Sequence, residues 1–165
     1  GSFDPITKGH VALIRKAAKL FSPVRVVVCV NSGKKEFLSP EKRLLLVRDA
    51  VKDLPNVTAE CCEGLFADYC HENGVTATVK GIRNAADFTY EKSLAQMNEA
   101  IFLAKGYSCP ETVYLPAEPK YEYCSSTFVR EMLRYGEDVT PHVPNAALLY
   151  SLLKEETIRE KSEKM

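Results

Sequence analysis

Short segments rich in β-branched residues alternate along this chain with longer amphipathic segments. The strand-like segments are residues 25–30, 57–62, 75–80 and 112–115. Nearly continuous apolar strands are typical of a sheet covered on both faces. Strands separated by helices pair in parallel through right-handed crossovers. The alternation therefore predicts an α/β fold with a parallel sheet, whose ligands bind beyond the carboxyl ends of the strands.

The helical segments carry recognisable start and stop signals. Ser39 and Pro40 fit the N-cap and the first position of one helix, and Gly74 fits the residue that follows another. A first helix is expected to carry the apolar residues between 11 and 21, with His10 in its first turn. The other predicted helices span residues 40–51, 65–73, 85–104, 126–133 and 144–154.

Length and charge limit the classes of function. A chain of 165 residues is expected to form one domain, residues 1–165. Its 22 basic and 22 acidic residues give a net charge of zero, which argues against nucleic acid or an anionic membrane as partner. No apolar run approaches the ~18 residues of a membrane span. The six cysteines form no C-x-x-C pair, so free thiols and a cytoplasmic location are expected.

The segment GSFDPITKGH, residues 1–10, is suited to binding phosphate. Thr7 is expected to cap the first helix, where free N–H groups and the helix dipole attract anions. An imidazole at that position, His10, can donate a hydrogen bond to a phosphate oxygen. The alternative is a surface histidine at an ordinary helix start.

Two further segments are also suited to binding an anionic ligand. Ser125 and Ser126 open a helix, so their hydroxyls and N–H groups can face an anion, although a plain serine cap is the simpler alternative. Residues 81–83 follow a predicted strand. Asp87 and Glu91 share a helix face, and the alternative to a ligand contact, plausible above all for Asp87, is a solvated face paired with lysines.

Three motifs in this order resemble one known family. GSFDPITKGH is similar to the T/H-x-G-H signature of the nucleotidyltransferase superfamily. KGIRNAADFTYEKSLAQMN (residues 80–98) and SSTFVR (residues 125–130) resemble the later motifs of bacterial phosphopantetheine adenylyltransferases. The resemblance implies a single Rossmann-like domain with a five-stranded parallel sheet and helices on both faces. The strand that the family has just before GSFDP is absent from this sequence.

The resemblance also implies a reaction. The enzyme would transfer AMP from ATP to 4′-phosphopantetheine, giving 3′-dephospho-CoA and pyrophosphate in coenzyme A biosynthesis. The acceptor is a phosphate monoester with a second pKa of ~6, largely dianionic at neutral pH, so no general base is required. Direct in-line attack is expected, with Mg²⁺ bound to ATP and no dedicated protein metal ligands. The family also implies a homohexamer.

Site residues follow from matching this sequence to the family motifs. The catalytic residues implied are His10 and Lys34. Those implied for ATP are Ser2, Phe3, His10, Gly81, Ile82, Arg83, Glu91, Tyr121, Glu122, Tyr123, Cys124, Ser125, Ser126 and Thr127. Those implied for 4′-phosphopantetheine are Ser2, Lys34, Phe66 and Lys80. This sequence departs from the family at Lys80, where arginine is usual, and at Phe66 and Cys124.

Two alternatives stand beside this hypothesis. One is another nucleotidyltransferase, such as a nicotinate-mononucleotide adenylyltransferase or a cytidylyltransferase, although the R-T-x-G-I-S-T-T motif typical of the latter is missing. The other is a non-catalytic nucleotide-binding homologue, against which the presence of Ser2, His10, Arg83 and Ser126 argues.

Overall fold

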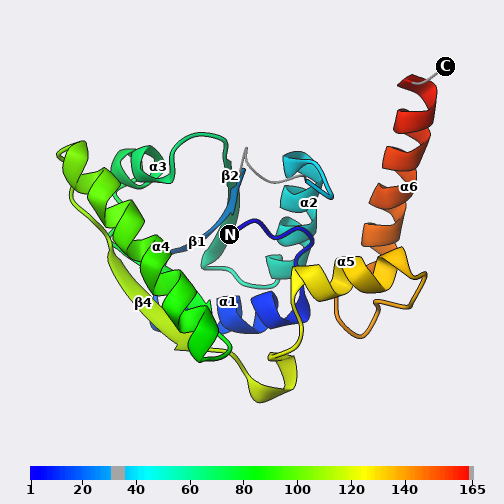
Figure 1. Cartoon of the computed structure of the whole chain (residues 1–165), viewed down its shortest axis with the longest axis horizontal. Coiled ribbons are helices and arrows are strands. Elements are labelled where there is room, and N and C mark those ends of the chain that lie inside the picture. The colour runs from blue at the N-terminus through cyan, green and yellow to red at the C-terminus, as the bar shows by residue number, and fades with distance from the viewer. Residues whose placement is uncertain (31–35, 164–165) are drawn as a thin grey trace.

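The computed structural model describes residues 1–30 and 36–163, and side chains up to residue 155. Helices and strands alternate through the first two thirds of the chain, and helices close it (Figure 1). Their bounds are α1 Lys8–Leu20, β1 Val24–Cys29, α2 Pro40–Val51, β2 Val57–Cys62, α3 Phe66–Glu72, β3 Ala77–Ile82, α4 Ala85–Ala104, β4 Glu111–Pro116, η1 Pro119–Tyr121, α5 Ser126–Arg134 and α6 Ala146–Glu163.

Capping residues set several of these boundaries. Ser39 accepts a hydrogen bond from the N–H of Lys42 and precedes Pro40 at the first position of α2, as predicted. Gly74 has φ +58° after α3, a conformation that favours glycine. Most predicted boundaries agree with the structure to within two residues, and two differences matter: β3 extends through Ile82 and therefore contains Gly81, and α6 continues to Glu163.

The strands are parallel, as predicted, but the described residues form two separate two-stranded sheets. β1 pairs with β2 from Val24↔Val57 to Cys29↔Cys62. β3 pairs with β4 from Ala77↔Glu111 to Ile82↔Pro116. The expected five-stranded sheet is not formed by these residues, because β1 and β3 do not pair and a cavity lies between them.

Helices join the two sheets into one body. α1 contacts β1, β3 and β4, so it spans the gap between the sheets. α2 packs on β1 and β2, and α4 packs on β3 and α3 at the other side of the molecule (Figure 1). The larger apolar core contains Val28 of β1, Val47 of α2, Val129 of α5 and Leu149 of α6, so the C-terminal helices share it with the β1–β2 sheet. No helix in the described ranges is long and apolar enough to cross a bilayer.

Candidate active site

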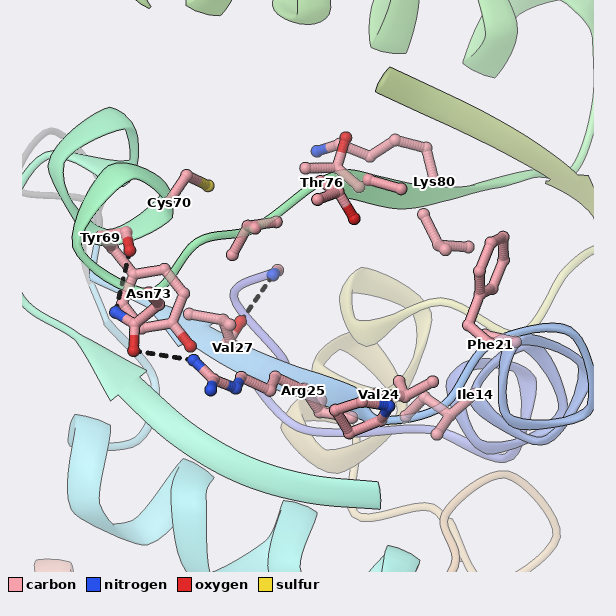
Figure 2. Close-up of a pocket in the computed structure, with 18 of the residues that line it drawn as sticks. Ile14, Phe21, Val24, Arg25, Val27, Tyr69, Cys70, Asn73, Thr76 and Lys80 are labelled. Atoms are coloured by element: carbon pink, nitrogen blue, oxygen red, sulfur yellow. Dashed lines mark hydrogen bonds between the residues drawn. The ribbon is translucent and has the colours of Figure 1, made fainter. Parts of the chain in front are cut away.

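A cavity of about 400 Å³ separates the two sheets. Its walls include residues 24–27 of β1 and 76–80 at and before β3. Figure 2 shows Val24 and Val27 on one side and Thr76 and Lys80 on the other. The cavity brings together several residues predicted for the site from distant parts of the sequence. They are Phe3, His10, Phe66 and Lys80.

Gly1 lies in this cavity and is bonded to β1. Its amino group donates to the carbonyl of Val27 at 2.8 Å, and its carbonyl accepts from the N–H of Cys29, also at 2.8 Å. Donation to one residue and acceptance from the residue two positions later is the pattern of a parallel ladder. Gly1 therefore takes the place of a strand residue beside β1.

His10 is fixed in the first turn of α1 by its N-cap residue. The hydroxyl of Thr7 accepts from the N–H of His10 at 3.3 Å, and Nδ1 of His10 accepts from the N–H of Thr7 at 3.0 Å. Acceptance at Nδ1 places the proton of a neutral imidazole on Nε2. Burial, helped by nearby positive charges that include Arg83, lowers the pKa of His10 to about 4. At neutral pH the ring is therefore an uncharged hydrogen-bond donor.

Phe3 holds the other side of the His10 ring. The two rings meet edge to face with centroids 5.2 Å apart. Phe3 has φ +47°, a left-handed conformation that is costly for a bulky residue and that clusters at functional sites. The first motif is thus bent sharply where it passes the imidazole.

The start of α5 is tied directly to the first motif. The hydroxyl of Ser126 donates to the carbonyl of Pro5 at 2.8 Å, and the guanidinium of Arg130 donates to the carbonyl of Asp4 at 2.6 Å. Ser125 is the N-cap of α5 and accepts from the N–H of Phe128 at 3.1 Å. The structure therefore brings the predicted serines beside the GSFDP segment, with the hydroxyl of Ser126 already engaged inside the protein.

The turn before α5 passes closely over the start of α1. A Cβ at Gly9 would lie 3.3 Å from the carbonyl oxygen of Cys124 and 3.4 Å from Cβ of Tyr121, so glycine permits this approach. Cys124 is 5% exposed, its thiol donates to the carbonyl of His142 at 3.4 Å, and its N–H donates to the carbonyl of Tyr121 at 3.0 Å. Tyr123 and Glu122 in the same turn are exposed.

The third motif carries two ion pairs. Arg83 binds Asp87 through two hydrogen bonds, Nε to Oδ2 at 2.6 Å and a terminal nitrogen to Oδ1 at 2.8 Å. This bidentate contact lowers the pKa of Asp87 and raises that of Arg83. Nζ of Lys80 lies 3.4 Å from Oε2 of Glu91, yet this buried oxygen accepts no hydrogen bond from the described residues. Both cations therefore have carboxylate partners that a phosphate can replace.

Gly81 and Ile82 lie within β3 rather than after it. A Cβ at Gly81 would lie only 2.6 Å from Cδ2 of Leu13 on α1. Gly81 therefore allows β3 to pack against the helix that carries His10, in addition to any backbone contact with a nucleotide.

The remaining predicted residues are placed as follows. Phe66 opens α3, and its ring stacks on Tyr69 with centroids 6.3 Å apart. Ser2 and Thr127 are exposed. Lys34 lies outside the described residues.

Sequence reasoning missed three charged residues that hold the site together. Asp4 accepts from the N–H groups of Phe37 and Leu38 at 2.8 and 2.9 Å, and Arg130 binds the carbonyl of Asp4. Asp4 and Arg130 lie inside the motifs GSFDPITKGH and SSTFVR, so their place in these motifs could have identified them as site residues. Arg43, buried in α2, has no comparable signal, because a charged residue in an amphipathic helix is expected on its surface.

Parallel strands, a helix N-terminus that carries a partly buried imidazole, and paired cations at the end of β3 are typical of a nucleotide-binding α/β protein. Residues 1–132 match the sequence profile of the Cytidylyltransferase-like family, so the chain belongs to that family.

Similar proteins with known names show which branch of this family the chain belongs to. It is 39% identical over 152 residues to the phosphopantetheine adenylyltransferase of Frankia casuarinae, with 90% of each chain covered. It is 41% identical over 144 residues to that of Thermobifida fusca, covering 87% of this chain and 84% of the relative. It is 40% identical over 148 residues to that of Streptomyces coelicolor, covering 90% and 89%. The chain is a member of the phosphopantetheine adenylyltransferase family.

Proposed function

We propose that this protein is a nucleotidyltransferase that transfers AMP from ATP to 4′-phosphopantetheine, giving 3′-dephospho-CoA and pyrophosphate. Family membership supports this reaction. The structural observation that carries it is the uncharged His10 at the start of α1, with its Nε2 proton free to bind an oxygen of the α-phosphate.

The chemistry requires positioning and charge stabilisation rather than a nucleophile on the protein. The phosphate of 4′-phosphopantetheine attacks the α-phosphorus of ATP, the new P–O bond forms, and the bond to the leaving pyrophosphate breaks in line with it. Negative charge builds on the oxygens of the α-phosphate during this step. A hydrogen bond from Nε2 of His10 and the dipole of α1 stabilise that charge.

Cations offset the repulsion between the two anionic substrates. Lys34 and Lys80 bind the acceptor phosphate, and Ser2 lies between the acceptor and ATP. Arg83 binds the β- and γ-phosphates together with Ser126 and Thr127. Before the substrates bind, Asp87 holds the Arg83 side chain in position, and Glu91 holds that of Lys80.

The nucleotide is bound between α1 and the turn before α5. Phe3, Gly81, Ile82 and Glu91 contact it from one side. The turn from Tyr121 through Glu122, Tyr123 and Cys124 to Ser125 contacts it from the other. Phe66 contacts the pantetheine arm. No group of three metal-ligating side chains occurs within residues 1–30 and 36–155, so Mg²⁺ would be held mainly by phosphate oxygens of ATP and water.

The cavity between β1 and β3 supports a five-stranded sheet. An extended segment leading into Gly1 would continue the ladder that Gly1 begins beside Val28, and it would pair with β3 on its other edge. The shared core of α5 and α6 with β1 supports a single domain over residues 1–165. Neutral net charge supports small-molecule partners rather than nucleic acid, and coenzyme A synthesis implies a cytoplasmic location.

Assembly into a homohexamer is supported by the surface of α4. Tyr90 and Met97 lie two turns apart on one face of this helix and are 57% and 65% exposed. Large apolar side chains at that spacing form a stripe that a second copy of the chain can cover.

The test is pyrophosphate release from ATP with 4′-phosphopantetheine, nicotinate mononucleotide or glycerol 3-phosphate as acceptor. Turnover is expected only with 4′-phosphopantetheine, and turnover only with another acceptor contradicts the proposal.

A variant tests the role of His10. His10→Ala is expected to lower kcat by about 10²–10³-fold with little change in KM, the cost of losing one hydrogen-bond donor to the α-phosphate. An unchanged kcat would remove His10 from the mechanism.

A further inference from the structure

Arg43 is a buried charge that bonds to three separate segments of the chain. It lies at the end of the first turn of α2 and is 2% exposed. One terminal nitrogen donates to the carbonyl of Ser2 at 3.0 Å and to that of Cys29 at 3.5 Å. The other donates to the carboxylate of Glu36. The guanidinium therefore links the first motif, the end of β1 and the segment that enters α2.

One of these three attachment points, Ser2, belongs to the proposed acceptor site. Ser2 is the residue proposed to lie between ATP and the acceptor phosphate. Cys29 and Glu36 flank, in sequence, the segment that contains Lys34. Arg43 thus holds the backbone of Ser2 itself and one residue on each side, in sequence, of the segment that contains Lys34.

A second buried charge ties the same two segments. The carboxylate of Asp4 accepts from the N–H groups of Phe37 and Leu38 at 2.8 and 2.9 Å. Two buried charged side chains therefore join the segments 2–4 and 36–38. Arg43 of α2 binds Ser2 and Glu36, and Asp4 binds the N–H groups of Phe37 and Leu38.

The energetic cost of burying Arg43 indicates that its role is to fix the positions of its partners rather than to stabilise the fold. A buried guanidinium pays a large desolvation penalty that its partners only partly return, and apolar residues of similar size often serve stability as well. Arg43 also leaves its Nε without an acceptor among the described residues. What the planar guanidinium provides, and an apolar side chain does not, is a rigid fork that fixes several acceptors at once.

We infer that Arg43 is a positioning residue for the acceptor phosphate. It touches no substrate; it sets the backbone of Ser2 against the end of β1 and the entry to α2, so that the acceptor is held in line with the α-phosphate. This inference rests on the proposed adenylyl transfer and adds a residue that acts through Ser2 and its neighbours.

The experiment compares Arg43→Lys and Arg43→Met with Val47→Ala. Val47 lies one turn further along α2, is fully buried and contacts the apolar core, so its variant reports loss of packing alone. Each variant is assayed by pyrophosphate release well below its melting temperature, with ATP and 4′-phosphopantetheine varied separately.

Arg43→Met is expected to lower kcat and to raise KM for 4′-phosphopantetheine, with a combined loss on the order of 10²-fold. KM for ATP is expected to stay within about twofold, because Arg83, Ser126 and Thr127, which are proposed to bind the β- and γ-phosphates, are not among the described contacts of Arg43. Arg43→Lys keeps the charge but loses the fork, so an intermediate loss is expected; it also serves if Arg43→Met fails to fold. Kinetic constants of the Arg43 variants that match those of Val47→Ala would overturn the inference.

Amide hydrogen exchange separates this inference from the proposed function. If the unmodified protein turns over none of the acceptors, the proposed reaction fails on its own. The positional role is then read from the amides of Cys29, Phe37 and Leu38. Faster exchange at these amides in Arg43→Lys than in Val47→Ala supports it, and equal protection in the two variants contradicts it.

Discussion

The backbone N–H of Thr7 donates to Nδ1 of His10 at 3.0 Å. The hydroxyl of Thr7 lies at the same distance from this nitrogen, but the backbone N–H can only donate, so Nδ1 is unprotonated and the proton of the neutral ring is on Nε2. Protonation of Nδ1 of His10 would break the bond and place a charge in a partly buried position. The N-cap of α1 therefore also keeps the imidazole neutral.

The pH dependence of stability tests the state of His10. Its pKa is about 4 in the folded protein, against 6.5 for the ordinary imidazole. Between these values the unfolded chain binds more protons, so the contribution of His10 to stability falls as pH drops from 6.5 and is constant below about 4. The difference in unfolding free energy between the unmodified protein and His10→Gln should therefore shrink by a few kcal/mol over that range. Urea unfolding at several pH values measures it, and parallel curves would contradict a depressed pKa.

The close approach of β3 to α1 predicts a coupled pair of substitutions. Gly81→Ala would place a Cβ 2.6 Å from Cδ2 of Leu13 and is expected to cost about 1–3 kcal/mol. Leu13→Ala removes the obstructing methyl group, so the double variant should lose less stability than the sum of the two single variants. Thermal unfolding of the four proteins completes the cycle. Additive losses would mean that Gly81 and Leu13 do not compete for space.

Ser126 and Thr127 should differ in what their hydroxyls do. The Ser126 hydroxyl is bonded to the carbonyl of Pro5, so Ser126→Ala is expected to cost about 1 kcal/mol of stability, with a modest effect on KM for ATP. The Thr127 hydroxyl accepts from Arg130 and is exposed, so its proton is free for a phosphate. Thr127→Ala should therefore raise KM for ATP with little change in melting temperature. A large rise in KM for Ser126→Ala together with a loss of stability for Thr127→Ala would contradict these two assignments.

The cavity beside β1 predicts that an added strand stabilises the protein. A five-residue extension of alternating valine and isoleucine, joined before Gly1, would bury apolar side chains against β1 and β3. A net gain of about 2 kcal/mol would raise the melting temperature by roughly 4–8 °C. An extension of glycine and serine with the same length is the control. Equal melting temperatures for the two extended proteins would show that the cavity does not take a strand.

Sequence signals within a single helix or strand predicted most elements well. The features that were not predicted depend on contacts between residues far apart in the sequence. The cap at Ser39 and the long apolar spacing of α4 gave correct boundaries because both signals lie within one element. The end of β3 was misjudged because Gly81 resembles a turn residue, whereas its role is to admit Leu13 from a distant helix.

The ion pairs show the same limit. The spacing of Asp87 and Glu91 correctly placed both on one face of α4, and pairing with lysine was one of the alternatives. Glu91 does pair with Lys80, but Asp87 pairs with Arg83, which precedes the helix. The bonds of Arg43 and Ser126 to the first motif join residues 41 and 121 positions apart, and no periodic pattern reports contacts of that kind.

The bond between Ser126 and Pro5 has a consequence for the order in which the protein is made. During synthesis, β1, α2 and β2 emerge early and can pair while the rest of the chain is unmade. The GSFDP segment can be held early by Arg43, Phe37 and Leu38, but Ser126 and Arg130 are made 121 and 126 residues after their partners Pro5 and Asp4. A growing chain therefore completes the attachment of this segment only when α5 has left the ribosome.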